Sequence, residues 1–186
     1  LLKLKIIMNI CIIGDGLTGL SLAKNLTNKK IDVHFYHKNK VKSLTSSRTI
    51  GISRNNLEFY KKEIYKIPKK IFWQIKKIEI YSEKLNKERL LKFEDKKDHL
   101  FYMLKNDELY KLLMKDLSNN EYFKKKLIKN DSSFKDLLKK NKYDLIINCD
   151  SNNFLSKKFF IKKIDKNYEN LAYTTILSHQ KLKNNV

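Results

Sequence analysis

The stretch CIIGDGLTGLSLAKNL, residues 11–26, holds three of the four glycines in the 186-residue chain. Gly14, Gly16 and Gly19 fit the pattern G-x-G-x-x-G, directly after an apolar run and before apolar positions that repeat at helical spacing. In a strand–turn–helix unit the first glycine permits the tight turn, the second lets a diphosphate approach the backbone, and the third lets helix and strand pack closely. The N–H groups and dipole at the helix start favour a negative charge. We therefore predict dinucleotide binding, rather than a purely structural turn, by Gly14, Asp15, Gly16, Leu17, Thr18 and Gly19.

The flanking sequence supplies the elements that this loop requires. Residues 5–13, KIIMNICII, are almost continuously apolar, which is typical of a strand buried on both faces of a parallel sheet. Residues 17–26 follow as a predicted helix, and residues 32–36, DVHFY, as a second strand, which completes a β-α-β unit. Residues 144–149, DLIINC, are suited to a further buried parallel strand. The predicted fold class is α/β, with a Rossmann-like parallel sheet.

The end of the second strand departs from the usual dinucleotide pattern. An acid about 20 residues after the glycines ordinarily binds a ribose hydroxyl, but here the position holds His37, followed by Lys38, Asn39 and Lys40. Histidine can hydrogen-bond a hydroxyl without replacing a carboxylate. The basic neighbours favour a 2′-phosphate and hence NADP, or they are simply solvated residues at a strand end.

The middle of the chain is less regular. Residues 72–84 and 88–95 alternate apolar and polar side chains, which predicts two antiparallel strands around a turn near Asn86. A helix is predicted from Asn106, which we expect to be its N-cap. Residues 118–142 are rich in Asn, Lys and Ser, and their pattern does not assign elements to them.

The charge of the chain is strongly basic, with 41 Lys+Arg against 20 Asp+Glu and a net charge of +21. Such an excess often indicates nucleic acid or an anionic membrane. Nucleic-acid readers favour Arg forks, whereas only Arg48, Arg54 and Arg89 are arginine here. We interpret the lysines as solvated faces and expect no specific nucleic-acid partner.

The remaining chemistry-bearing residues give few signals. Cys11 and Cys149 each lie in a short apolar run, which favours buried structural thiols in a reducing compartment. The four histidines show no ligand spacing, so no metal site is predicted. Apolar runs are far shorter than the roughly 20 residues of a membrane helix. These features favour a cytoplasmic protein.

Two later segments resemble a known family. SSRTIGISRNNLEFY, residues 46–60, resembles the segment after the second strand in flavin-dependent aromatic-ring hydroxylases, which have a p-hydroxybenzoate hydroxylase-like fold, and specifically their ubiquinone-biosynthesis branch. There an arginine and a small-apolar-Ser stretch lead into a helix beside the flavin nucleotide, and Arg48 matches that arginine. YMLKNDELYKLL, residues 102–113, is similar to the family's return strand and helix, with a cofactor contact near Asn106.

A third segment matches the family in part. LIINCDSNNFLSKK, residues 145–158, falls where the family has G-A-D-G-x-x-S-x-x-R. Asp150 matches, while Ser151, Phe154 and Lys157 replace the glycine, the serine and the arginine. The resemblance implies a cofactor role for Asp150, and the alternative is a cap after the strand.

The resemblance also implies a domain organisation. Residues 8–66 and 100–157 match a discontinuous FAD-binding domain, and residues 67–99 and 158–186 match part of an antiparallel β substrate domain. Residues 1–7 are expected to be an upstream extension. The match covers the N-terminal half of a family member.

The function that the resemblance implies is aromatic hydroxylation. It implies FAD, NAD(P)H as electron donor, oxygen, and a polyprenyl-phenol substrate that is a ubiquinone precursor, with peripheral association to the inner membrane left open. No catalytic acid, base or nucleophile is predicted, because the cofactor performs the difficult step. The alternatives are an NAD(P)-binding reductase and a degenerate, non-enzymatic basic surface or partner-binding module. The cofactor-binding residues predicted outside the glycine loop are His37, Lys38, Arg48, Asn106 and Asp150.

Overall fold

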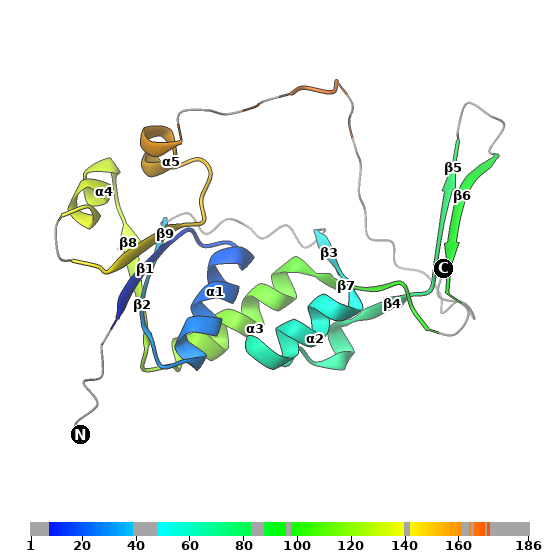
Figure 1. The fold of residues 1–186 in the computed structure, drawn as a ribbon, viewed down its shortest axis with the longest axis horizontal. Helices are drawn as coiled ribbons and strands as arrows, with labels where there is room; N and C mark the ends of the chain where they lie inside the picture. Colours follow the sequence, from blue (N-terminus) through cyan, green and yellow to red (C-terminus); the bar gives the residue numbers. More distant parts are fainter. Residues whose placement is uncertain are drawn as a thin grey trace.

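The structure, a computed structural model, describes most of the chain. The described residues are 8–38, 48–82, 88–95, 98–139, 142–160, 164, 166–169 and 171. The expected extension at residues 1–7 and nearly all of residues 168–186, which were matched to the substrate domain, lie outside them. Figure 1 shows a parallel sheet flanked by helices at one end of the molecule and a β-hairpin at the other.

A four-stranded parallel sheet forms the centre of the α/β part, in the order β8-β2-β1-β9. Its strands are β1 (Asn9–Ile13), β2 (Asp32–Lys38), β8 (Phe123–Ile128) and β9 (Leu145–Asn148). The predicted α/β class with a parallel sheet is confirmed.

Helices cover both faces of this sheet (Figure 1). They are α1 (Leu17–Asn28) and α3 (Asn106–Ser118) on one face, and α4 (Asp131–Leu137) and α5 (Phe154–Phe159) on the other. Because side chains alternate along a strand, Ile10 and Ile12 pack toward α1 and α3, while Cys11 and Ile13 pack toward α4 and α5. Both faces of β1 are therefore buried, which explains its continuous apolar sequence.

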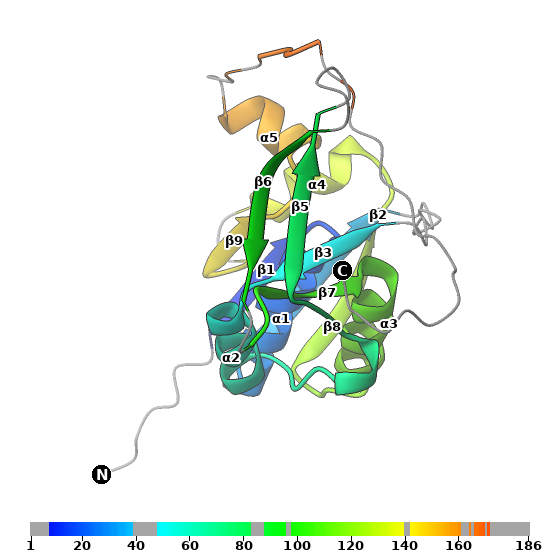
Figure 2. The same ribbon diagram turned by 90° about the vertical axis from the view of Figure 1, so that its right-hand side faces the viewer.

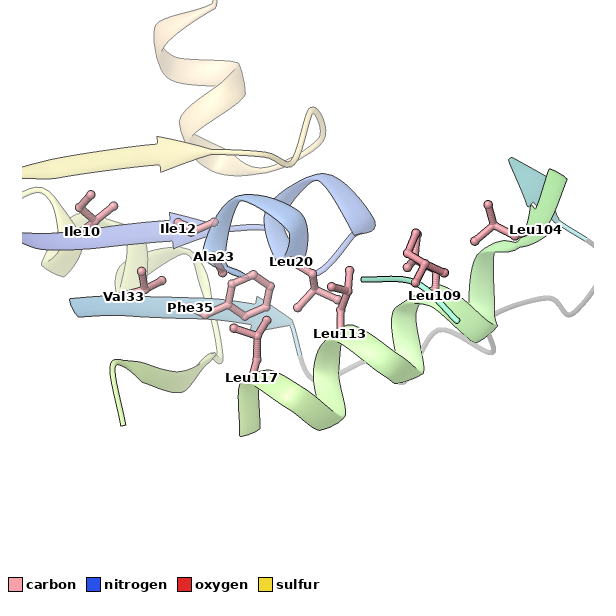
Figure 3. Packing of buried hydrophobic residues seen from close by; sticks show 11 residues of the cluster. Ile10, Ile12, Leu20, Ala23, Val33, Phe35, Leu104, Leu109, Leu113 and Leu117 are labelled. Atoms are coloured by element: carbon pink, nitrogen blue, oxygen red, sulfur yellow. The ribbon is translucent and has the colours of Figure 1, made fainter. Parts of the chain in front are cut away.

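The larger core lies between the sheet and α1 and α3. In Figure 3 the Phe35 ring points from β2 toward Leu113 and Leu117 of α3, with Leu20 of α1 beside them. All four side chains are fully buried. Burying one such side chain contributes about 1.5–3 kcal/mol, so this contact fixes α1, and with it the glycine loop, against the sheet.

A smaller antiparallel sheet has the order β3-β7-β4. It consists of β3 (Thr49–Ile52), β7 (Phe101–Lys105) and β4 (Trp73–Ile75), with α2 (Arg54–Glu63) after β3 and a 3₁₀ turn, η1 (Lys69–Ile71), before β4. Trp73 on β4 is 44% exposed, and the Lys105 ammonium lies 5.9 Å from its ring centroid.

The hairpin formed by β5 (Lys77–Tyr81) and β6 (Arg89–Glu94) extends away from the parallel sheet (Figure 1), and Figure 2 shows its strands side by side. Cross-strand register pairs Ile78 with Phe93 and Ile80 with Leu91, so one face is apolar. The other face carries the ion pairs of Lys77 and Arg89 with Glu79, and of Lys92 with Glu94. Ile80, Leu91 and Phe93 are between 42% and 52% exposed.

Two predictions about elements were wrong, and one segment that the sequence left unassigned contains ordered elements. The strand predicted at 72–84 is two strands, because the chain changes partner from β7 to β6 between Ile75 and Lys77. Residues 118–142 contain β8 and α4, although no element was predicted there. Asn106 is not an N-cap. Pairing with Thr49 holds Lys105 extended as the cap, and Asn106 is already helical.

Candidate dinucleotide-binding site

The glycine loop lies at the carboxyl edge of the parallel sheet, where the strand order reverses. β2 pairs with one side of β1 and β9 with the other. In open α/β sheets, ligands bind outside the carboxyl ends of the strands at such a switch point. The chain leaves β1 at Gly14 and enters α1 at Leu17, so the loop lies at the switch point.

Gly14 and Gly19 are required for close backbone packing. Gly14 has φ +115°, and a Cβ there would lie 2.9 Å from the carbonyl carbon of Cys149. A Cβ on Gly19 would lie 2.4 Å from the carbonyl oxygen of Gly14. These approaches match the turn and packing functions that the sequence predicts for the first and third glycines.

Packing does not require a glycine at position 16, because a Cβ on Gly16 would have no atom other than those of its chain neighbours within 4 Å. Gly16 is exposed and is the N-cap of α1, without a side-chain cap. The first intrahelical bond is donated by the Leu20 N–H to the Gly16 carbonyl at 3.1 Å. The preceding N–H groups, from Leu17 to Gly19, therefore have no intrahelical acceptor. An open approach to uncapped N–H groups fits a diphosphate.

Lys38 and Asp150 meet at the same edge. The Lys38 ammonium lies 3.1 Å from Oδ2 of Asp150, and their side chains are 49% and 27% exposed. His37 is partly exposed, with Nδ1 3.3 Å from the Lys38 carbonyl oxygen. The structure thus brings three predicted residues together with the glycine loop, and it pairs Lys38 with a carboxylate. Their contacts with a cofactor stay predictions.

Three polar side chains that the sequence reasoning missed hold Asp150 in place. Asn148 and Asn153 exchange amide hydrogen bonds of 2.6 and 3.3 Å, and Asn148 also donates to Ser156 Oγ at 2.8 Å. Ser156 Oγ donates to the Asp150 carbonyl at 2.6 Å, and the Asn152 N–H donates to Oδ1 of Asp150 at 2.9 Å. Asn153 also caps α5 by accepting from the Ser156 N–H at 2.9 Å. An N-cap pattern, Asn153 before a short apolar run, was the available signal.

Arg48 and Asn106 lie next to each other in the smaller sheet region. The Asn106 N–H donates to the Arg48 carbonyl at 2.9 Å, and Arg48 is exposed. The helix expected within residues 46–60 is present as α2, capped by Ser53 Oγ, which accepts from the Asn56 N–H at 3.3 Å. Both predicted residues therefore lie where an extended strand meets a helix start.

Tyr110 of α3 lies near enough to the glycine loop for the charge of Asp15 to act on its phenol. Burial raises the pKa of its phenol, and the Asp15 carboxylate raises it further. Tyr110 lies one turn after Asn106. A hydrogen bond of 2.8 Å between Ser21 Oγ and the Tyr60 hydroxyl links α1 to α2. The elements that carry Arg48 and Asn106 are thus packed against the helix that the loop opens.

The cysteines are not suited to nucleophilic chemistry. Both are free thiols, and burial raises the pKa of Cys11 to about 12 and also raises that of Cys149. A thiol that stays protonated at neutral pH is a poor nucleophile and a poor metal ligand.

Within the described ranges, no group of three His, Cys, Asp or Glu could hold a metal ion. In the same part of the chain, no helix has the length and hydropathy needed to cross a membrane.

Comparison with known proteins reveals similarity of structure alone. No protein-family model matches the chain, and no curated protein gives a significant match. The p-nitrophenol 4-monooxygenase PnpA from Pseudomonas putida DLL-E4 matches with a TM-score of 0.53 and 15% identity, over 65% of this chain and 32% of that one. PqsL from Pseudomonas aeruginosa, a probable FAD-dependent monooxygenase, matches with a TM-score of 0.52 and 12% identity, over 64% of this chain and 32% of that one. At these identities the likeness establishes a shared fold, and the chain spans about a third of either structure.

Proposed function

We propose that the chain forms the dinucleotide-binding part of an FAD-dependent monooxygenase that hydroxylates an aromatic ring. The observation that carries this proposal is the loop from Gly14 to Gly19. Two of its glycines are required by packing, and the third leaves the start of α1 open. The fold shared with two monooxygenases and the family-like segments around Arg48, Asn106 and Asp150 support the same function.

Different residues of the chain would bind different parts of the cofactor. The backbone from Gly14 to Gly19 would hold the diphosphate. His37 and Lys38 lie at the end of β2, where such folds bind the ribose of the adenosine half. Arg48 and Asn106 would lie beside the flavin half. When bound, the cofactor would supply the oxygen-activating chemistry for hydroxylation, while these residues would bind and orient it.

The finer parts of the proposal rest on the family resemblance. We propose a polyprenyl-phenol precursor of ubiquinone as substrate, NAD(P)H as electron donor, and a cytoplasmic protein that associates peripherally with the inner membrane. The segment at residues 46–60, which resembles the ubiquinone-biosynthesis branch, supports this choice.

Titration of the purified chain with FAD tests the proposal. We expect saturable quenching of flavin fluorescence, and little binding of riboflavin, which lacks the diphosphate. Gly16→Val should weaken FAD binding at least tenfold, equivalent to about 1.4 kcal/mol, because its side chain would fill the approach to the N–H groups. Equal affinity for riboflavin and FAD, or no effect of Gly16→Val, would contradict the assignment of this loop.

An NAD(P)-binding reductase is the second candidate, and the basic end of β2 favours it. Lys38 stands close to where NAD- and FAD-binding folds usually carry an acid. Parallel titrations with NADPH, NADH and FAD distinguish the two functions. Tighter binding of NADPH than of FAD would favour the reductase, and the reverse order would exclude it.

A further inference from the structure

Lys38 and Asp150 occupy equivalent positions on the two sides of the glycine loop. In the parallel register Ile13, the last residue of β1, is level with Tyr36 of β2 and with Asn148 of β9. Lys38 follows Tyr36 by two residues, and Asp150 follows Asn148 by two. Both therefore lie beyond the end of β1, at the level of the chain that leaves it through Gly14 and Asp15.

The ion pair between them spans the edge of the sheet. β2 and β9 are not neighbours, because β1 lies between them, so their backbones are about 10 Å apart. The Lys38 ammonium and Oδ2 of Asp150 nevertheless approach to 3.1 Å. The two side chains thus meet across the carboxyl end of β1, the place where a dinucleotide lies in this class of sheet.

We propose that Lys38 and Asp150 form a clasp across the dinucleotide site that is closed without ligand and that opens when a diphosphate binds. The Lys38 ammonium then passes from the Asp150 carboxylate to a ligand phosphate. This inference rests on the proposed function, because it takes the loop from Gly14 to Gly19 as the diphosphate site.

Lys38 and Asp150 differ in how firmly their side chains are held, and the proposed exchange of partner requires such a difference. Asp150 is fixed by its loop, where its carbonyl accepts from Ser156 Oγ and its Oδ1 accepts from the Asn152 N–H. Lys38 is held at the last residue of a strand, with a long side chain that is half exposed. An exposed ion pair is weak because water screens it, and a diphosphate offers more charge and more acceptor oxygens than one carboxylate. The lysine is therefore the half that moves.

A double-mutant cycle on ligand binding tests the clasp. Dissociation constants for ADP are measured at low salt for the wild-type chain, Lys38→Met, Asp150→Asn and the double variant. The quotient is the product of the wild-type and double-variant constants divided by the product of the two single-variant constants. Separate effects of each side chain on the ligand cancel in this quotient, so it reports only the change in Lys38–Asp150 coupling on binding.

We expect a quotient about two- to fivefold above one, the range an exposed ion pair supports, falling toward one in high salt. A quotient at or below one means that the pair persists or tightens with ligand, and it overturns the proposal. The same cycle on unfolding of the ligand-free chain must show favourable coupling, and its absence also overturns the clasp.

Two controls separate this proposal from the proposed function. Lys24 and Asp116 form a 2.6 Å ion pair between α1 and α3, and the cycle on Lys24→Met and Asp116→Asn should give a quotient of one. FAD binding with a Lys38–Asp150 quotient of one removes the clasp and leaves the proposed function standing. Failure of all four proteins to bind ADP overturns the clasp, and failure of the wild-type chain to bind FAD as well overturns the proposed function.

Discussion

A Cβ on Gly19 would lie 2.4 Å from the Gly14 carbonyl oxygen, whereas a Cβ on Gly16 would meet nothing within 4 Å. Gly19→Ala should therefore lower the free energy of unfolding by about 2–4 kcal/mol, because backbone must move to admit the methyl group. Gly16→Ala should lower it by less than about 1 kcal/mol, the scale of an altered N-cap. Urea unfolding followed by circular dichroism measures both, and equal losses would contradict the packing described for the loop.

His34 is the residue for which the structure predicts a pH dependence. Its Nδ1 lies 2.8 Å from the Tyr143 hydroxyl and 3.1 Å from the Lys126 ammonium. Burial first, and then the charges of Lys126 and Lys124, lower the pKa of His34. The unfolded chain, with a histidine pKa near 6.5, takes up the proton at a higher pH than the folded chain does.

The contribution of His34 to stability is therefore complete above about pH 6.5 and is lost as the pH falls toward the lowered pKa of the folded state. Below that value both states hold the proton and the slope ends. We expect a loss of less than about 1 kcal/mol, because the imidazole is partly solvated. His34→Gln should flatten the dependence of the unfolding free energy between pH 7.5 and pH 5. An unchanged slope would show that His34 does not titrate in this way.

Among the elements, α5 is held by the side chain of Asn153. Asn153 is 2% exposed, caps α5 and bonds to Asn148, so its loss leaves buried polar groups without partners. Asn153→Ala should lower the free energy of unfolding by about 1–3 kcal/mol. The neighbouring exposed Asn152 donates only its backbone N–H to Asp150, so Asn152→Ala is the matched control and should stay within about 0.5 kcal/mol. A comparable loss for both variants in thermal or urea unfolding would refute the cap.

The sequence predicted the elements whose apolar residues form a clear run or stripe, and it failed where lysines or a short length obscure that pattern. β1 and β9 are almost continuously apolar, although β9 is an edge strand and its Leu145 is exposed, and α3 has a clear apolar stripe. β8 is an edge strand with three consecutive lysines, which hide its apolar pattern and also discourage pairing with other chains. α4 has only seven residues, too few for a periodic signal.

The candidate site, like the fold, was predictable from the sequence only in part. The glycine pattern carries its own backbone requirements, and the structure meets them at Gly14 and Gly19. The pairing of Lys38 with Asp150 was not predictable, since the residues are 112 positions apart and meet only through the register of three strands. Local sequence encodes the loop, whereas the sheet determines its neighbours.

At the scale of the whole molecule, stability should be unevenly distributed. The parallel sheet is covered on both faces, while β6 is exposed along its entire length and, among the strands that the structure describes, β5 pairs with β6 alone. A two-stranded ribbon is marginal by itself. Hydrogen exchange should therefore be much faster in β5 and β6 than in β1 and β2, by orders of magnitude if the hairpin opens locally. Uniform protection across both regions would indicate that the hairpin unfolds only with the rest of the chain.

The position of Trp73 has a practical consequence for every optical experiment on this chain. It is the single tryptophan of the sequence, and it lies half exposed on β4. The Lys105 ammonium lies over its ring. Its intrinsic emission therefore reports on the small antiparallel sheet and not directly on the parallel sheet. If emission and far-ultraviolet ellipticity give different midpoints on denaturation, the difference measures how independently those two parts melt.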